Sequence, residues 1–118
     1  MGRVFLVHWH EEEAKEKARE LAGWGWDVRV EHADGAKAVR HIGEEPPDAV
    51  VISLARLPAH GRETADALQR MKTTRSTPIV FVDGTADKVA EARAKVPGAL
   101  WTTWPALRAT LAMFRKTR

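Results

Sequence analysis

The feature that most constrains the fold is a regular alternation of short apolar runs with segments of helical periodicity, repeated five times. Each apolar run is long enough for one strand, and the segments between them place apolar residues at helical spacing. The ranges that indicate strands are 3–7, 27–31, 49–53, 78–84 and 98–103, and those that indicate helices are 11–25, 34–48, 62–74, 85–96 and 104–117. Parallel strands need such crossovers, so the sequence predicts an α/β fold: a doubly wound, five-stranded parallel sheet with five helices.

The character of the individual strands indicates their order in the sheet. Residues 49–53, AVVIS, are apolar throughout, as expected for a central strand that helices cover on both faces. Residues 27–31, DVRVE, alternate apolar and charged side chains, which is typical of an edge strand with one face toward solvent. We therefore predict the strand order 2-1-3-4-5.

Length and composition limit the classes of protein that remain. A chain of 118 residues can bury one substantial core, so we predict a single domain over 1–118. Cysteine is absent, which excludes disulfides and thiolate chemistry. Because no apolar stretch approaches the roughly 20 residues that span a bilayer, we expect a cytoplasmic protein that does not enter a membrane.

The net charge of +3 raises the question of nucleic-acid binding. Basic and acidic residues are interspersed along most of the chain, and only Arg115, Lys116 and Arg118 form a local basic cluster. A nucleic-acid interface normally shows a basic stripe or patch. Direct binding of nucleic acid is therefore not expected.

Three segments carry a resemblance to a known family. They are PPDAVVISLARLP (46–58), TPIVFVDG (77–84) and VPGALWTTWP (96–105). In order and spacing they resemble the third strand with its following turn, the fourth strand, and the start of the fifth strand and last helix of receiver domains of bacterial response regulators. The resemblance runs from Arg3 to Arg115. It implies the receiver fold and a role in two-component signalling.

The same alignment places unusual residues at every position that the family uses for phosphoryl transfer. His8 and Trp9 stand where the resemblance implies an acidic pair for Mg²⁺, and Ser53 where it implies the phosphoacceptor aspartate. Asp83 takes the position of a hydroxyl residue and Trp104 that of a lysine. Phosphoryl transfer depends on Mg²⁺ with hard oxygen ligands and on charge neutralisation. We therefore expect a pseudo-receiver without enzymatic activity or cofactor, acting as a phosphorylation-independent protein-interaction module.

Two other uses of these residues remain open. His8, Ser53 and Asp83 should lie at the carboxyl edge of neighbouring strands, where doubly wound folds bind ligands, and they are the residue types of a hydrolase triad. The G-x-S-x-G pattern of a nucleophile elbow is missing around Ser53. His8 and His10, with Glu11 and His60 nearby, offer ligands for a transition metal. An enzyme, or a small-molecule or metal-binding domain, is therefore the alternative.

Tryptophan is unusually frequent, with five residues against three Phe and no Tyr. Trp24 and Trp26 are expected to cap the core. Trp101 takes the position where receivers commonly carry an aromatic residue that changes orientation on phosphorylation. A candidate interaction face over the fourth helix, fifth strand and fifth helix comprises Arg93, Trp101, Trp104, Arg108 and Arg115. The expected partners are a second copy in a homodimer, a histidine kinase, another regulator or an output protein.

Overall fold

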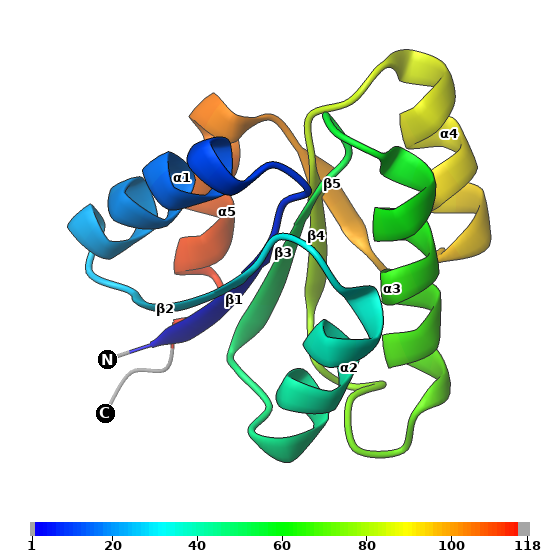
Figure 1. Ribbon diagram of the computed structural model, residues 1–118, viewed down its shortest axis with the longest axis horizontal. Coiled ribbons are helices and arrows are strands. Elements are labelled where there is room, and N and C mark those ends of the chain that lie inside the picture. The colour runs from blue at the N-terminus through cyan, green and yellow to red at the C-terminus, as the bar shows by residue number, and fades with distance from the viewer. Residues whose placement is uncertain (1, 116–118) are drawn as a thin grey trace.

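The computed structural model describes residues 2–115 and contains five strands and five helices in strict alternation (Figure 1). The strands are β1 (Arg3–Val7), β2 (Asp27–Glu31), β3 (Ala49–Ser53), β4 (Ile79–Val82) and β5 (Leu100–Thr102). The helices are α1 (Glu11–Gly23), α2 (Gly35–Glu44), α3 (Pro58–Arg70), α4 (Ala86–Lys95) and α5 (Trp104–Ala112). The basic residues Lys116 and Arg118, and the end of the expected last helix, lie outside the described residues.

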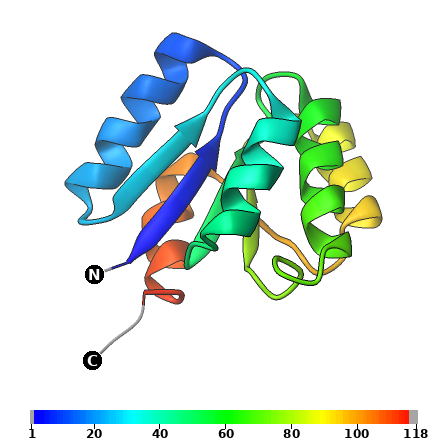
Figure 2. The same ribbon diagram turned by 60° about the horizontal axis from the view of Figure 1, so that its bottom comes forward.

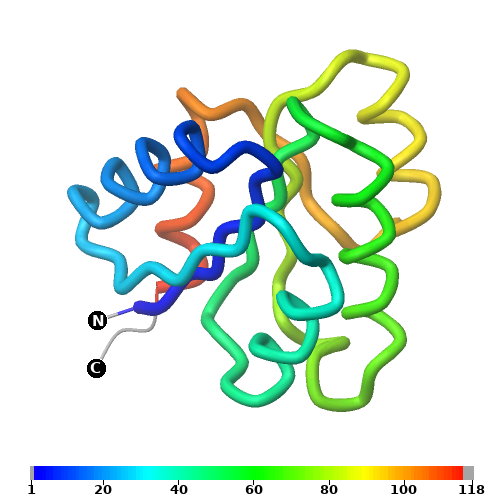
Figure 3. Tube along the Cα trace, viewed as in Figure 1, coloured from blue at the N-terminus to red at the C-terminus, as the bar shows by residue number. Residues whose placement is uncertain are grey.

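The predicted sheet is confirmed. All four strand pairings are parallel and the strand order is β2-β1-β3-β4-β5. Figure 3 follows the chain as it leaves the sheet after each strand and returns through a helix. The carboxyl ends of all five strands therefore meet at one edge of the sheet, where the loops that begin the helices gather.

Alternation of side chains along the strands divides the core into two layers. On β1, Phe5 and Val7 face the cluster formed with α2, α3 and α4, whereas Val4 and Leu6 face the cluster formed with α1 and α5. Figures 1 and 2 show these two groups of helices on opposite faces of the sheet. The strand β3 is buried along its whole length, as the AVVIS run predicted.

The third helix differs from the sequence prediction at both ends. It begins at Pro58, where proline is favoured in the first turn because its missing N–H would have no partner there. It ends at Arg70, and Thr74 lies in the following turn with its hydroxyl donating to the Leu68 carbonyl. Leu57 precedes the helix with a φ of 42°, a left-handed conformation that costs a leucine roughly 1–2 kcal/mol.

Gly61 brings this helix close to the sheet. A Cβ at this position would lie 2.8 Å from the Ile52 side chain and 3.3 Å from the Ser53 carbonyl oxygen. The absent side chain therefore sets how near α3 lies to the carboxyl end of β3, next to the positions that the sequence singled out.

Candidate site at the carboxyl edge of the sheet

His8 follows β1 and is buried, with 1% of its surface exposed. Its Nε2 lies 2.9 Å from Glu13 Oε1, while Nδ1 is buried without a hydrogen-bond partner in the described structure. This arrangement fits the tautomer that carries the proton on Nε2, because a buried N–H donor without an acceptor costs more than an unused acceptor. His8 therefore points its donor at the first turn of α1.

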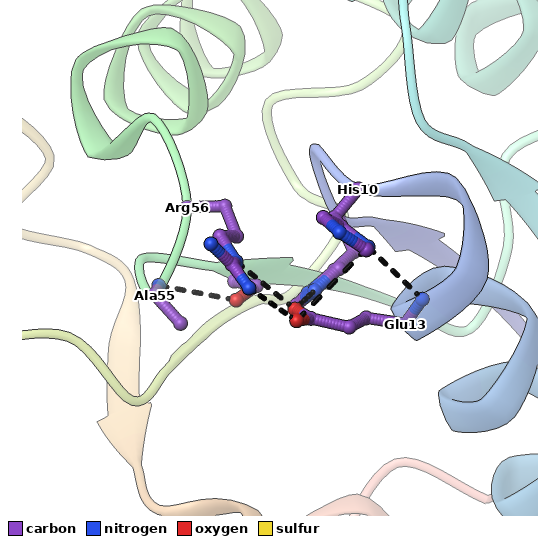
Figure 4. A network of polar contacts seen from close by, with 6 residues as sticks. His10, Glu13, Ala55 and Arg56 are labelled. Carbon is purple, nitrogen blue, oxygen red and sulfur yellow. Dashed lines mark hydrogen bonds and ion pairs between the residues drawn. The ribbon is translucent and has the colours of Figure 1, made fainter.

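The Glu13 carboxylate also forms an ion pair with Arg56, which lies in the loop between β3 and α3. Arg56 Nε lies 3.2 Å from Glu13 Oε1, and the Arg56 terminal nitrogen bonds the second carboxylate oxygen. Figure 4 shows the Glu13 carboxylate in contact with Arg56, while the Glu13 backbone N–H donates to His10 Nδ1. Arg56, and after it His8, lowers the pKa of Glu13 from 4.5 to about 2. A guanidinium–carboxylate pair thus joins α1 to the β3–α3 loop.

Ser53 ends β3 at the position expected for a phosphoacceptor. It is 2% exposed, and its Oγ accepts a hydrogen bond of 3.2 Å from the Ala55 backbone N–H. The hydroxyl therefore stabilises the turn after β3. A nucleophile needs an exposed oxygen and a base that removes its proton, and the described contacts of Ser53 supply neither.

Asp83 has a different task at the end of β4. Its carboxylate Oδ1 accepts the backbone N–H of Trp104 at 3.0 Å, and its carbonyl oxygen accepts Trp101 Nε1 at 3.0 Å. Across residues 2–115, no hydrogen bond joins His8, Ser53 or Asp83 to another member of that set. The three residues lie on one edge of the sheet, as predicted, without forming a triad.

Mg²⁺, which the receiver resemblance implies, does not fit this edge. It requires hard oxygen ligands in octahedral geometry. The position after β1 offers the His8 imidazole and the Trp9 indole, and the Glu13 carboxylate is already bound to Arg56. Within the described residues the structure contains no group of three or more His, Cys, Asp or Glu side chains that could hold a metal ion.

His10, the second candidate metal ligand, caps α1. Its Nδ1 accepts the Glu13 backbone N–H at 3.3 Å, whereas His8 is buried beneath the loop. Because the strand ends at Val7, the two imidazoles do not continue a strand alternation, and each lies beside the Glu13 carboxylate.

The candidate interaction face requires a larger correction. Trp101 packs with the α2–α3–α4 side of the core, whereas Trp104 packs with the α1–α5 side. The Trp104 ring lies against Trp24, with centroids 5.7 Å apart and an interplanar angle of 36°, and its Nε1 donates to Glu20 of α1. Arg115 donates to the Trp24 carbonyl at 3.0 Å and lies over the Trp26 ring, so it also faces away from β5.

What remains on the α4–β5–α5 surface is smaller and includes a residue that the sequence analysis missed. Arg93 and Arg108 are exposed on α4 and α5, and Leu100 on β5 is 41% exposed. The sequence could have indicated Leu100 as part of this surface, because it is an apolar residue in a strand that lies at the edge of the sheet and pairs with β4 alone. The contacts of Glu13 with Arg56 had no comparable signal, because 43 residues separate the two in the chain.

Comparisons with known proteins agree with this geometry at the level of the fold. No family model and no curated protein sequence matches the chain. It is similar to the structure of the chemotaxis protein CheY4 of Vibrio cholerae, with a TM-score of 0.79 and 20% identity over 98% of this chain and 99% of that one. The chain has the receiver fold.

Two further receiver structures are similar. The receiver domain of the Francisella response regulator 1452 gives a TM-score of 0.76 at 18% identity, over 97% of this chain and 96% of that one. The receiver domain of the sensor histidine kinase PA1611 of Pseudomonas aeruginosa gives a TM-score of 0.71 at 23% identity, over 95% and 92% of the chains. That structure has a magnesium ion coordinated in its active-site cleft. In the described part of this chain, no helix is long and apolar enough to cross a membrane.

Proposed function

We propose that this protein is a pseudo-receiver: a single receiver-like domain that acts through protein contacts and independently of phosphorylation. The observation that carries the proposal is the Glu13–Arg56 ion pair, with His8 bonded to the same carboxylate. A guanidinium is a permanent cation at pH 7, so this edge of the sheet is neutralised without a metal ion. Among residues 2–115, no base is hydrogen-bonded to the buried Ser53 hydroxyl.

The interaction surface in this proposal is the exposed part of α4, β5 and α5. Leu100 supplies an apolar contact on an edge strand, and Arg93 and Arg108 supply long side chains that are common at interfaces. The partner is a second copy of the chain, a histidine kinase, another regulator or an output protein. A second copy is the partner that purified protein can test.

The alternative function, a ligand-binding or catalytic site around His8, Ser53 and Asp83, receives less support. Each of the three side chains is engaged in a different local contact, and two of them are almost fully buried. We therefore retain the interaction module as the proposed function.

The test is exposure of the protein to acetyl phosphate and Mg²⁺, followed by intact-protein mass spectrometry. We expect no phosphoryl adduct on the wild-type protein. The matched variant is Ser53→Asp, which restores a carboxylate at the end of β3 and leaves the Glu13–Arg56 pair in place. We expect it to remain unlabelled too, because the metal ligands after β1 are still absent.

Stoichiometric labelling of the wild type at any aspartate, Asp83 included, would contradict phosphorylation independence. Labelling of Ser53→Asp alone would show that His8 and Trp9 still admit Mg²⁺, and would contradict the argument that this edge is closed to the ion. Indole N–H signals recorded with beryllofluoride and Mg²⁺ give a second readout, and we expect them not to move.

A further inference from the structure

A cavity lies between α2 and α3, beside the edge of the sheet described above. Its volume is about 440 Å³, within the roughly 300–1,000 Å³ typical of small-molecule sites. It is lined by the loop after β1, the loop before α2, the first turns of α2 and one side of α3. Figure 2 shows α2 and α3 side by side over this face of the sheet.

Trp9 and His60 are the aromatic residues that line the cavity. The Trp9 indole is 8% exposed and is held in the core of the α2–α3–α4 side, so its orientation is fixed by packing. The His60 ring meets it edge-on, with ring centroids 5.7 Å apart and an interplanar angle of 87°. The rest of the wall includes the small side chains of Ala36 and Ala67. A flat aromatic ring system matches a wall made of an indole and small apolar groups.

Gly35 keeps α2 open to this surface. A Cβ at Gly35 would lie 2.9 Å from Thr64 Oγ1 and 3.6 Å from the Trp9 ring. The Thr64 hydroxyl already donates to the His60 carbonyl at 2.9 Å, so it is fixed in place. The absence of a side chain at the start of α2 therefore keeps space between the two helices beside the edge of the Trp9 ring.

Charge selects the class of ligand. The residues of the described chain that line the cavity include the carboxylates of Asp34 and Glu63 and neither lysine nor arginine, although basic residues outnumber acidic ones in the whole sequence. Glu63 has no hydrogen-bond or ion-pair partner among the described residues. Two carboxylates in a cavity that no lysine or arginine of the described chain lines favour a cation.

The N-terminus of α2 makes the electrostatic potential of the cavity more positive, but its effective charge is smaller than that of the two carboxylates. A helix N-terminus is equivalent to about half a positive charge. Asp34 already satisfies part of it, since its Oδ1 accepts the Lys37 backbone N–H at 3.1 Å. About half a unit of positive charge does not outweigh two carboxylates, so the cavity remains electrostatically negative.

We propose that the cavity between α2 and α3 is a binding site for a planar aromatic cation, which would lie in the cavity beside Trp9 and pair with Asp34 and Glu63. This inference goes beyond the proposed function. Its charged residues, Asp34 and Glu63, take no part in the proposed function and its partner is different, so it stands whether or not the protein accepts a phosphoryl group.

The experiment titrates the 118-residue chain with two acridines of the same ring size and opposite charge. Proflavine carries a positive charge, and acridine-9-carboxylate carries a negative one. Binding is followed by fluorescence anisotropy of the dye and by the indole N–H signal of Trp9 in NMR. We expect saturable one-to-one binding of proflavine with a shift of the Trp9 signal, and binding of acridine-9-carboxylate at least about tenfold weaker.

Four variants test the site. Ala67→Phe fills the cavity from α3 and is expected to weaken proflavine binding about tenfold or more. Ala36→Phe fills the cavity from the exposed side of α2 with the same expected effect, and it replaces the first variant if that one folds poorly. The matched control is Ala59→Phe, an exposed position of α3 that does not line the cavity, and it should leave the affinity unchanged. The double variant Asp34→Asn/Glu63→Gln keeps a capping side chain and removes both charges, so proflavine should bind about tenfold less tightly.

Absence of saturable proflavine binding would overturn the proposal. Equal binding of the two acridines, or full affinity in the charge-removed double variant, would also overturn it, because electrostatic selection would then be missing. Full affinity in a folded Ala36→Phe or Ala67→Phe variant would place the dye elsewhere and overturn it as well.

Discussion

Asp83 bonds a side chain of β5 and the start of α5 through two different atoms. The sequence comparison with receivers assigned it the place of a hydroxyl residue, whereas the structure shows its carboxylate at the first N–H of α5. Thr103, the residue before α5, makes no side-chain capping bond of its own. Asp83 also has a φ of 62°, a left-handed conformation that Asp and Asn tolerate better than other side chains. It therefore acts as a structural cap supplied from β4.

Replacement of this residue gives a stability prediction. Asp83→Ala should lower the free energy of unfolding by about 2 kcal/mol, because it removes a cap and places alanine in a left-handed conformation. Asp83→Asn should stay within about 0.5 kcal/mol of the wild type, since it retains both the acceptor and the tolerance of that conformation. Urea unfolding measures both. Equal losses in the two variants would attribute the effect to the charge and contradict the capping role.

At the scale of elements, β5 is short, lies at the edge of the sheet and exposes Leu100. The tryptophans, which are frequent in the sequence, do not form an exposed surface together with Leu100. Trp104 rests on α1, where Lys17 lies 4.3 Å above its ring, and Trp101 is tied to the Asp83 carbonyl. Any contact through this face therefore depends on Leu100 and the flanking arginines more than on the indoles.

Self-association tests that face. If a second copy docks there, Leu100→Asp should raise the dimer dissociation constant about tenfold or more, because a charge would be buried in an apolar contact. Leu57→Asp is the matched control: Leu57 is 55% exposed and lies at the start of α3, away from β5. Sedimentation equilibrium measures the association. Equal effects of the two variants, or a monomer at every concentration, would contradict dimerisation through β5.

At the scale of the whole molecule, the contact between Glu13 and Arg56 connects α1 with the loop between β3 and α3. The pKa of Glu13 is about 2, against 4.5 for an unperturbed glutamate. A lowered carboxyl pKa stabilises the folded state above about pH 4.5, and this contribution disappears as the pH falls from 4.5 through 2. Acid should therefore weaken this connection only well below neutral pH.

The corresponding prediction concerns Arg56→Gln. In this variant the pKa of Glu13 should rise toward 4.5, because the largest cause of its depression is removed while the His8 contact remains. The Glu13 carboxyl ¹³C shift, followed against pH, measures the midpoint in both proteins. Glu13→Gln identifies the signal by its absence. A wild-type midpoint near 4.5 would contradict the ion pair.

The sequence was sufficient to predict how the strands and helices are layered in this molecule. It was insufficient to predict which side chains contact each other at the carboxyl edge of the sheet. Uninterrupted runs such as AVVIS and the alternating DVRVE follow from burial on two faces or one, so the strand order could be predicted. The pairing of Glu13 with Arg56 depends on how two loops meet in space, which periodicity does not encode. The same holds for Trp104, whose choice of α1 over β5 is decided by a side-chain rotamer and by packing.

The Glu13–Arg56 pair has one more consequence for how such a protein would be controlled. A phosphoryl group is added by one reaction and removed by another. The active state of a receiver that depends on phosphorylation therefore has a limited lifetime. An arginine side chain is put in place once, at translation, and cannot be hydrolysed away. On the function proposed above, the cell would therefore adjust the signal by changing how many copies exist, through synthesis and degradation.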